Sequence, residues 1–249
     1  MKLVLVLLLA VPVFAGDISG DISGAIDTFT DNGLNATQRN TACLALRGVK
    51  TPEVIAAMRS ALDSVRLQAC AGMNLRVAGA NEELLNALED KDPTARAVAA
   101  RELGSTQKHE FLVPLRRAAE DKDLLVSSNA VEGLVRYEDH ASIPQLREIA
   151  MLGGVLTSLA TDTLVDWHDP EVLVIARQLI TRKEPGDQLI GVRVIGLTGN
   201  ASDLPKMREL AKDETALSGG SRGFGLMPAV SISRAARTAV QAIEARAGK

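Results

Sequence analysis

Aromatic side chains, cysteine and histidine are all scarce in this sequence. Only 2% of the 249 residues are aromatic, and there are two cysteines and three histidines. Aromatic and β-branched residues concentrate in β-sheets, so a core with few rings favours closely packed helices. Basic residues are also not in excess, with 28 lysines and arginines against 31 acidic residues. The chain therefore lacks the charge excess that nucleic-acid binding requires.

The amino terminus has the pattern of a secretory leader. Lys2 precedes an apolar run over residues 3–13, and Ala15 then precedes Gly16. A cationic start, a short apolar stretch and a small residue before the cleavage point are typical of signal peptides. The run is shorter than the roughly 20 residues of a membrane-spanning helix. We expect residues 1–15 to be removed and the mature protein, without a transmembrane segment, to be secreted or periplasmic.

A small residue followed four positions later by an aliphatic residue recurs along the chain. Residues four apart share one face of a helix, and a small one lets a neighbouring helix approach closely. The seven pairs are Ala42 with Leu46, Ala69 with Met73, Ala99 with Leu103, Ala130 with Leu134, Ala160 with Leu164, Gly191 with Ile195, and Ala236 with Val240. The spacing predicts an all-α fold, a right-handed α-solenoid of about seven helix pairs over residues 37–249.

The helices of these units resemble HEAT repeats. The first helix of one unit reads Ala-Ala-Arg-Glu-Leu-Gly at 99–104, and the second helix of the next reads Ile-Pro-Gln-Leu at 143–146. The HEAT-like repeats of phycobilin lyases are the nearest type. The resemblance implies a helical solenoid and, because such repeats serve many roles, no single function. The basic residue that the family places at the start of the first helix is present as Arg39, Arg66 and Arg96.

Two segments depart from the repeat. Residues 16–36 are rich in glycine at their start and form a linker or a capping segment. Residues 216–231 lengthen the step before the last unit and are expected to form an exposed loop. Insertions in solenoids tend to lie on a binding face. Arg222 and Phe224 in this loop are therefore candidate partner-binding residues.

Five arginines occupy equivalent places on the second helices of the units. They are Arg59, Arg116, Arg147, Arg177 and Arg208. One interpretation is a strip that binds an acidic peptide, because a guanidinium can bind a carboxylate through two hydrogen bonds. The other is a structural ladder in which each arginine pairs with an acid of the same or the next unit, such as Arg59 with Asp63. Trp167, in a turn, is either a binding hot spot or a cap on a helix pair.

Cys43 and Cys70 are candidates for a disulfide. An oxidising compartment favours the bond. They fall in equivalent places of the first two units, where side chains point the same way, and this geometry argues against it. The three histidines, His109, His140 and His168, lie in turns of successive units, too far apart to share one ion. Deoxyhypusine hydroxylase, a HEAT-like di-iron enzyme, uses several His-Glu pairs, and this chain has one.

These observations predict a protein that works without catalysis. No catalytic residue, metal or cofactor is expected. The first hypothesis is an extracytoplasmic scaffold that binds a protein or peptide partner, an acidic one if the arginines form a binding strip. The alternative is an accessory lyase or another enzyme that acts on a small molecule or prosthetic group.

Overall fold

The computed structural model describes residues 18–212 and 231–248, and these residues form helices and no β-strand. The helices are α1 Ile18–Thr30, α2 Ala36–Ala45, α3 Pro52–Ser60, α4 Gln68–Ala78, α5 Asn81–Ala87, α6 Pro93–Gly104, η1 His109–Phe111, α7 Leu112–Ala118, α8 Leu124–Arg136, η2 His140–Ser142, α9 Ile143–Leu152, α10 Thr157–Asp166, α11 Val172–Leu179, α12 Pro185–Thr198, η3 Ala201–Asp203, α13 Leu204–Lys212 and α14 Ile232–Ala247. The fold is an α-solenoid of helix pairs, as the sequence predicts.

Side-chain caps mark where several helices begin. The side chain of Asn35 accepts a hydrogen bond from the N–H of Gln38, and the Gln38 side chain bonds back to the N–H of Asn35. Asp92 accepts from the N–H of Thr94 at 2.6 Å, and Pro93 occupies the first position of α6. These contacts satisfy backbone N–H groups that have no partner within the helix. Local sequence therefore sets the boundaries of each repeat.

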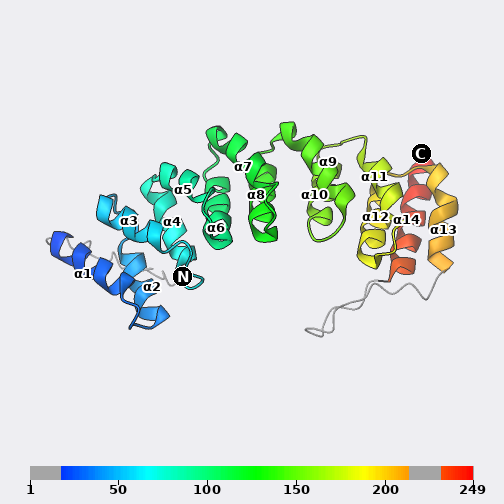
Figure 1. Ribbon diagram of the computed structural model, residues 1–249. Coiled ribbons are helices and arrows are strands. Elements are labelled where there is room, and N and C mark those ends of the chain that lie inside the picture. The colour runs from blue at the N-terminus through cyan, green and yellow to red at the C-terminus, as the bar shows by residue number, and fades with distance from the viewer. Residues whose placement is uncertain (1–17, 213–230, 249) are drawn as a thin grey trace, which may run out of the picture. The chain divides into compact units, whose positions relative to one another are not determined.

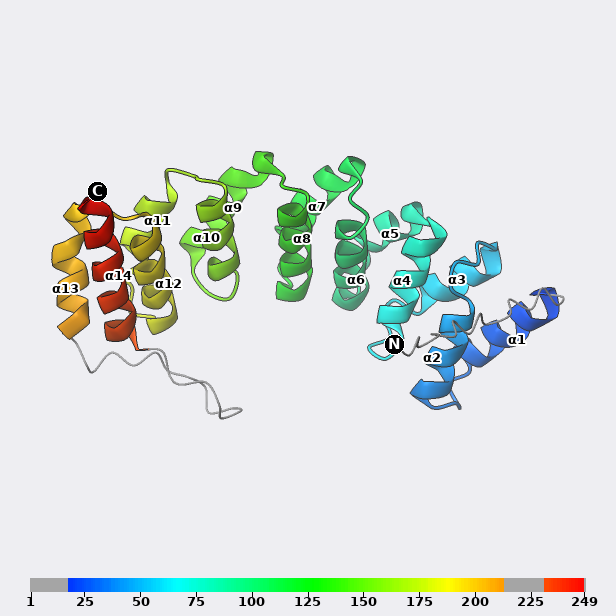
Figure 2. The same ribbon diagram turned by 180° about the vertical axis from the view of Figure 1, so that it is seen from behind.

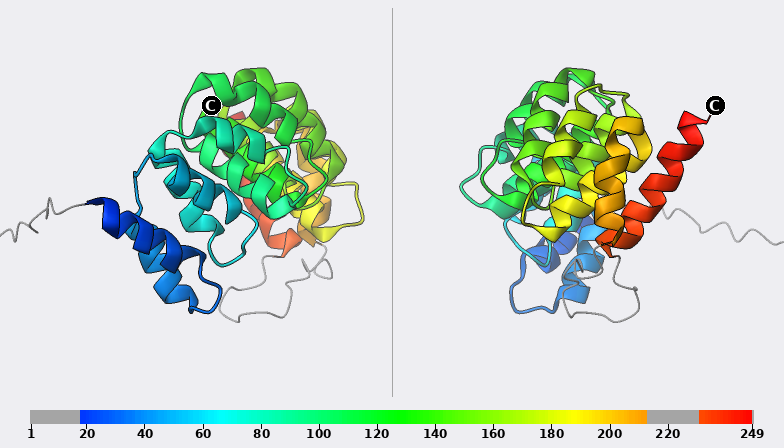
Figure 3. Two further views of the ribbon diagram at one scale, coloured as in Figure 1. Left: turned by 60° about the vertical axis from the view of Figure 1, so that its left-hand side comes forward. Right: turned by 90° about the vertical axis from the view of Figure 1, so that its right-hand side faces the viewer.

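The structure consists of two compact units, and the division falls within α8, after Gly133. In the first unit α2, α4 and α6 pack in succession, with α3 and α5 beside them (Figure 1). In the second unit α10, α12 and α14 pack in succession, with α9, α11 and α13 beside them (Figure 2). Figure 3 shows α14 next to α13 at the end of the described residues. Within each unit, successive helix pairs thus pack against one another.

The predicted pairs of a small and an aliphatic residue are part of the buried core in five of the seven repeats. The second helix-pair repeat differs, because Ala69 is exposed and Met73 is only half-buried. Its fully buried pair is Ala71 with Leu75, two residues further on. The prediction was wrong here because the sequence offers two pairs with the same four-residue spacing. Only packing against the neighbouring helices selects one of them.

The ends of the described chain also depart from a simple repeat. The first helix, α1, packs against α2 and buries Phe29 completely. Among the described residues, α14 is the only helix of the last repeat, so six helix pairs are followed by a single helix. In α14 the buried apolar side chains after Ala236 are Ala239 and Ile243, while Val240 is half-buried. The predicted leader at 1–15 and the loop residues Arg222 and Phe224 lie outside the described residues.

Candidate functional site

An apolar groove of about 540 Å³ runs between α12 and α14 in the second unit. One wall is a row of α12 residues four apart, Leu189, Arg193 and Leu197. The opposite wall is a row on α14 with the same spacing. Its members are Arg234, Thr238 and Ala242. Rows of residues four apart are the ridges that pack into grooves when two helices meet.

The floor of the groove is built from small side chains. A Cβ atom added to Gly196 would lie 3.2 Å from the Cβ of Ala239, so the two helices approach closely there. Arg246 donates to the carbonyl oxygens of Gly196 and Gly199 at 2.8 and 2.9 Å. Residues later in α12 thus contact residues later in α14, so the two helices run in the same direction. The close approach leaves the flanking ridges standing above a shallow apolar floor.

The two arginines at the groove differ in their partners. Arg193 forms an ion pair with Asp162 and donates to Ser158 at 3.3 Å, so it bridges α10 and α12. The exposed guanidinium of Arg234 has no hydrogen bond or ion pair with any described residue. Leu197, on the C-terminal side of the Gly196 contact, is 54% exposed. The groove therefore carries both arginines, together with Leu189, on one side of the Gly196 contact and only apolar wall residues on the other.

Four of the predicted ladder arginines pair with an acid of the next repeat. Arg59 contacts Asp90 at 2.7 Å and lies 4.0 Å from Glu83. Arg147 contacts Asp169 at 2.6 Å. The remaining two pairs are Arg177 with Asp203 at 2.8 Å and Arg208 with Glu244 at 2.7 Å. These contacts correspond to the structural interpretation of the ladder, with Asp90 rather than Asp63 as the partner of Arg59.

The carboxylates of this ladder are also held by backbone N–H groups. The N–H of Glu171 donates to Asp169 at 2.9 Å, and the N–H of Asn200 donates to Asp203 at 2.9 Å. Burial alone would raise the pKa of Asp203, but the hydrogen bonds from Arg177 and Asn200 outweigh it and leave the pKa below its usual value. Arg116, the fifth member, lies in the last turn of α7. Partner binding by these arginines stays a prediction.

Trp167 follows α10 directly and stacks on the imidazole of His140, with ring centroids 4.5 Å apart and an interplanar angle of 22°. The indole is half-buried, and His140 belongs to the turn of the preceding repeat. Trp167 thus links the turns of two repeats. This contact gives the residue a structural role, and a role in binding stays a prediction.

The structure joins Cys43 and Cys70 in a disulfide, with Cα atoms 6.3 Å apart. The geometric argument against the bond was wrong because it assumed equivalent places in two repeats. Cys43 follows the buried Ala42, whereas Cys70 precedes the buried Ala71. The side chains therefore face each other across α2 and α4. Asn74 lies beside the bridge and donates to the carbonyl oxygens of both cysteines at 3.1 and 3.0 Å.

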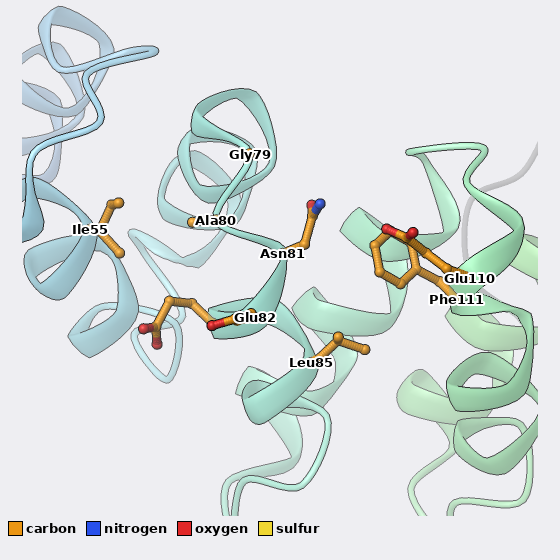
Figure 4. Close-up of a pocket in the computed structure, with 9 residues that line it drawn as sticks. Ile55, Gly79, Ala80, Asn81, Glu82, Leu85, Glu110 and Phe111 are labelled. Atoms are coloured by element: carbon orange, nitrogen blue, oxygen red, sulfur yellow. The ribbon is translucent and has the colours of Figure 1, made fainter.

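A second concave surface, of about 600 Å³, lies in the first unit and is acidic (Figure 4). Glu82, Glu83 and Glu110 line it, together with Ile55 and Phe111. Glu110 and the neighbouring His109 are exposed. Among the described residues there is no group of three or more histidines, cysteines or acids placed to hold a metal ion. Exposed glutamates around an open surface do not define a site.

One of the comparisons with known proteins, the family match, bears on the class of the fold. Residues 81–152 match the family model of HEAT repeats. Human deoxyhypusine hydroxylase in complex with glycerol aligns with 91% of this chain and 96% of its own, at 17% identity and a TM-score of 0.41. An engineered protein aligns with 90% of this chain and 97% of its own, at 15% identity and a TM-score of 0.31. No curated protein matches the sequence.

These findings confirm the resemblance to HEAT repeats and correct the function drawn from it. The prediction of a non-catalytic extracytoplasmic scaffold was wrong as a conclusion from the fold, since a HEAT-like structure aligned with this chain is an enzyme. At 17% identity and a TM-score of 0.41 that alignment gives this chain no activity. No helix of the described residues is long and apolar enough to cross a membrane.

Sequence reasoning missed Arg193, Leu197 and Arg234. A signal was present in α12, where apolar residues follow one another on every side of the helix instead of along one stripe. A helix that is apolar all round is buried or meets a further partner. Exposure of Leu197 shows that the described neighbours leave part of α12 uncovered.

Proposed function

We propose that this protein binds a helical segment of another polypeptide in the groove between α12 and α14. The observation that carries the proposal is the pair of parallel ridges with four-residue spacing above the small-residue floor around Gly196. A third helix can place its own ridge between them, which is how helices pack in protein cores. Apolar residues on that helix would cover Leu197, whose exposed surface is otherwise in contact with water.

The contrast between the two arginines of the groove supports this choice. The ion pair between Arg193 and Asp162 and the bond to Ser158 cross from α12 to α10. Ser158 also lines the groove, so this bridge fixes the edge of the groove that faces α10. No ion pair between described residues crosses from the α12 wall to Arg234 or Thr238 in the same way. The groove beside α14 is therefore open to a partner.

The binding test uses a fluorescent helical peptide with leucines four residues apart and glutamine at its remaining polar positions. Its affinity for the protein is measured by fluorescence anisotropy. We expect Leu197→Gln to weaken binding about fivefold to tenfold, because an apolar contact is lost. Leu125→Gln is the matched control, since Leu125 on α8 is 56% exposed and Leu197 is 54% exposed. Equal losses in both variants, or no binding by the unsubstituted protein, would contradict the proposal.

We also propose that the protein is exported and loses residues 1–15. The apolar run after Lys2 and the small residue Ala15 support a cleaved leader. The disulfide between Cys43 and Cys70 supports it too, because such bonds persist mainly in oxidising compartments. Amino-terminal sequencing of the protein purified from its host is expected to begin at Gly16. A chain that retains its first residues would refute export by this route.

A further inference from the structure

The groove between α12 and α14 also carries a charge that no described residue balances. Arg234 stands three residues after the capping Ser231, in the first turn of α14. The positive end of a helix dipole lies there, so a cation is unfavourably placed. The first turn of α14 holds no acidic residue, and no described residue pairs with the Arg234 guanidinium.

The position of Arg234 along the groove is fixed by the helix contacts. Gly196 packs against Ala239, so residues before this contact on both helices lie at the same end of the groove. Arg193 precedes Gly196 by three residues, and Arg234 precedes Ala239 by five. Both arginine side chains therefore lie at one end, together with Leu189, while Leu197 and Ala242 lie at the other.

We infer that the helical segment bound in this groove is amphipathic and carries an acidic side chain that pairs with Arg234. This inference rests on the proposed function and names the chemistry of its partner. A carboxylate at the cationic end would neutralise Arg234 and meet the positive end of α14. Apolar side chains one and two turns further along the same ridge would reach Leu197 and Ala242. The spacing of charge and apolar surface along the groove sets the direction of the bound helix.

The test compares three versions of the leucine peptide, with glutamate, glutamine or lysine one turn before the first leucine. At about 20 mM salt we expect the glutamate version to bind about fivefold more tightly than the glutamine version, and the lysine version more weakly. At about 300 mM salt the preference is expected to shrink, because an exposed ion pair is screened. Circular dichroism checks that each protein variant keeps its helical content.

The decisive variant is Arg234→Gln, which is expected to abolish the preference for glutamate over glutamine. Arg47→Gln is the matched control, because Arg47 is exposed, is outside the groove and has a side chain without a partner among the described residues. This control is expected to keep the full preference. Equal affinities of the glutamate and glutamine peptides, or a preference that survives in Arg234→Gln, would overturn the inference.

The outcomes separate the inference from the proposed function. If the glutamine peptide binds in a manner that depends on Leu197 but glutamate adds nothing, the groove binds helices and the acidic requirement is wrong. If no peptide binds, both proposals fail. Dodecanoate serves as a competitor that offers a carboxylate and an apolar chain without a backbone. Displacement of the peptide by dodecanoate, lost in Arg234→Gln, would assign the groove to fatty acids and overturn the polypeptide partner.

Discussion

At the scale of single residues, small side chains decide how closely the helices approach. Ala99, Ala130 and Ala160 are fully buried at contacts between successive repeats, as the sequence predicts. The same pattern failed at Ala69, because the stretch 69–75 contains two small residues, each with an apolar residue four positions on. A rule based on local sequence cannot choose between two residue pairs that both satisfy it. Only the position of the neighbouring helices excludes one.

Enlarging a buried small residue is expected to destabilise the unit that contains it. Ala130→Leu would force extra methyl groups into a filled contact and lower the free energy of unfolding by about 1–3 kcal/mol. Ala69→Leu makes the same chemical change at an exposed position and is expected to leave stability within about 0.5 kcal/mol. Urea denaturation followed by circular dichroism measures both. Comparable losses at the two positions would refute the repeat positions described above.

At the scale of helices and turns, ion pairs connect each repeat to the next. Arg96 is the most enclosed example, because it donates two hydrogen bonds to Asp121 at 2.7 and 3.1 Å. It also donates to the carbonyl oxygens of Asp90 and Lys91 in the preceding turn. The family resemblance marked Arg96 as the basic residue at the start of a first helix. The identity of its acidic partner could not be read from the sequence, since many acids lie at suitable distances along the chain.

Removing Arg96 is expected to cost much more than removing a surface arginine. Arg96→Ala would leave Asp121 without its main donor, and we expect a loss of about 2 kcal/mol in the free energy of unfolding. Arg117 also forms an ion pair, with Glu89 at 3.4 Å, but its side chain is 75% exposed. Arg117→Ala should therefore cost less than about 0.5 kcal/mol. Chemical denaturation of the two variants gives the comparison, and equal losses would show that enclosure of the pair is immaterial.

The same pairs make stability depend on pH. The hydrogen bond from Arg96 lowers the pKa of Asp121, and the hydrogen bond from Arg59 lowers the pKa of Asp90. A carboxyl with a lower pKa in the folded state adds stability above its unfolded pKa of about 3.9, and this stability disappears as the pH falls through the folded pKa. We expect the free energy of unfolding to decline below about pH 4. Arg96→Ala should decline less steeply, and an identical slope would contradict this origin.

At the scale of the whole molecule, the sequence predicted the class of fold but not the candidate site. Repetition made the solenoid readable, because the same small and aliphatic pattern occurs seven times. The groove depends instead on which ridges remain uncovered where α12 meets α14. Leu189, Leu197 and Arg234 become one surface only after α12 and α14 of two successive repeats have packed. No local pattern encodes that arrangement.

The disulfide is expected to contribute strongly to the stability of the first unit. It joins residues 27 apart in sequence, and closure of a loop of this size is worth about 3.5 kcal/mol in the chain-entropy account. Replacing both cysteines by serine should therefore lower the urea midpoint of this unit. A reducing agent should have the same effect on the unsubstituted protein and none on the variant. Quantitative thiol titration of the unfolded, unreduced protein is expected to find no free thiol, and two free thiols would contradict the bridge.

The ion pairs of Arg147 and Arg177 have a consequence for how such a chain can change in length. Each arginine binds the aspartate that precedes the second helix of the following repeat, Asp169 and Asp203 respectively. A duplicated repeat inserted between them would bring its own aspartate for the arginine before it and its own arginine for the aspartate after it. Every buried carboxylate would keep a donor. Whole repeats can therefore be inserted or deleted without leaving a buried carboxylate unpaired.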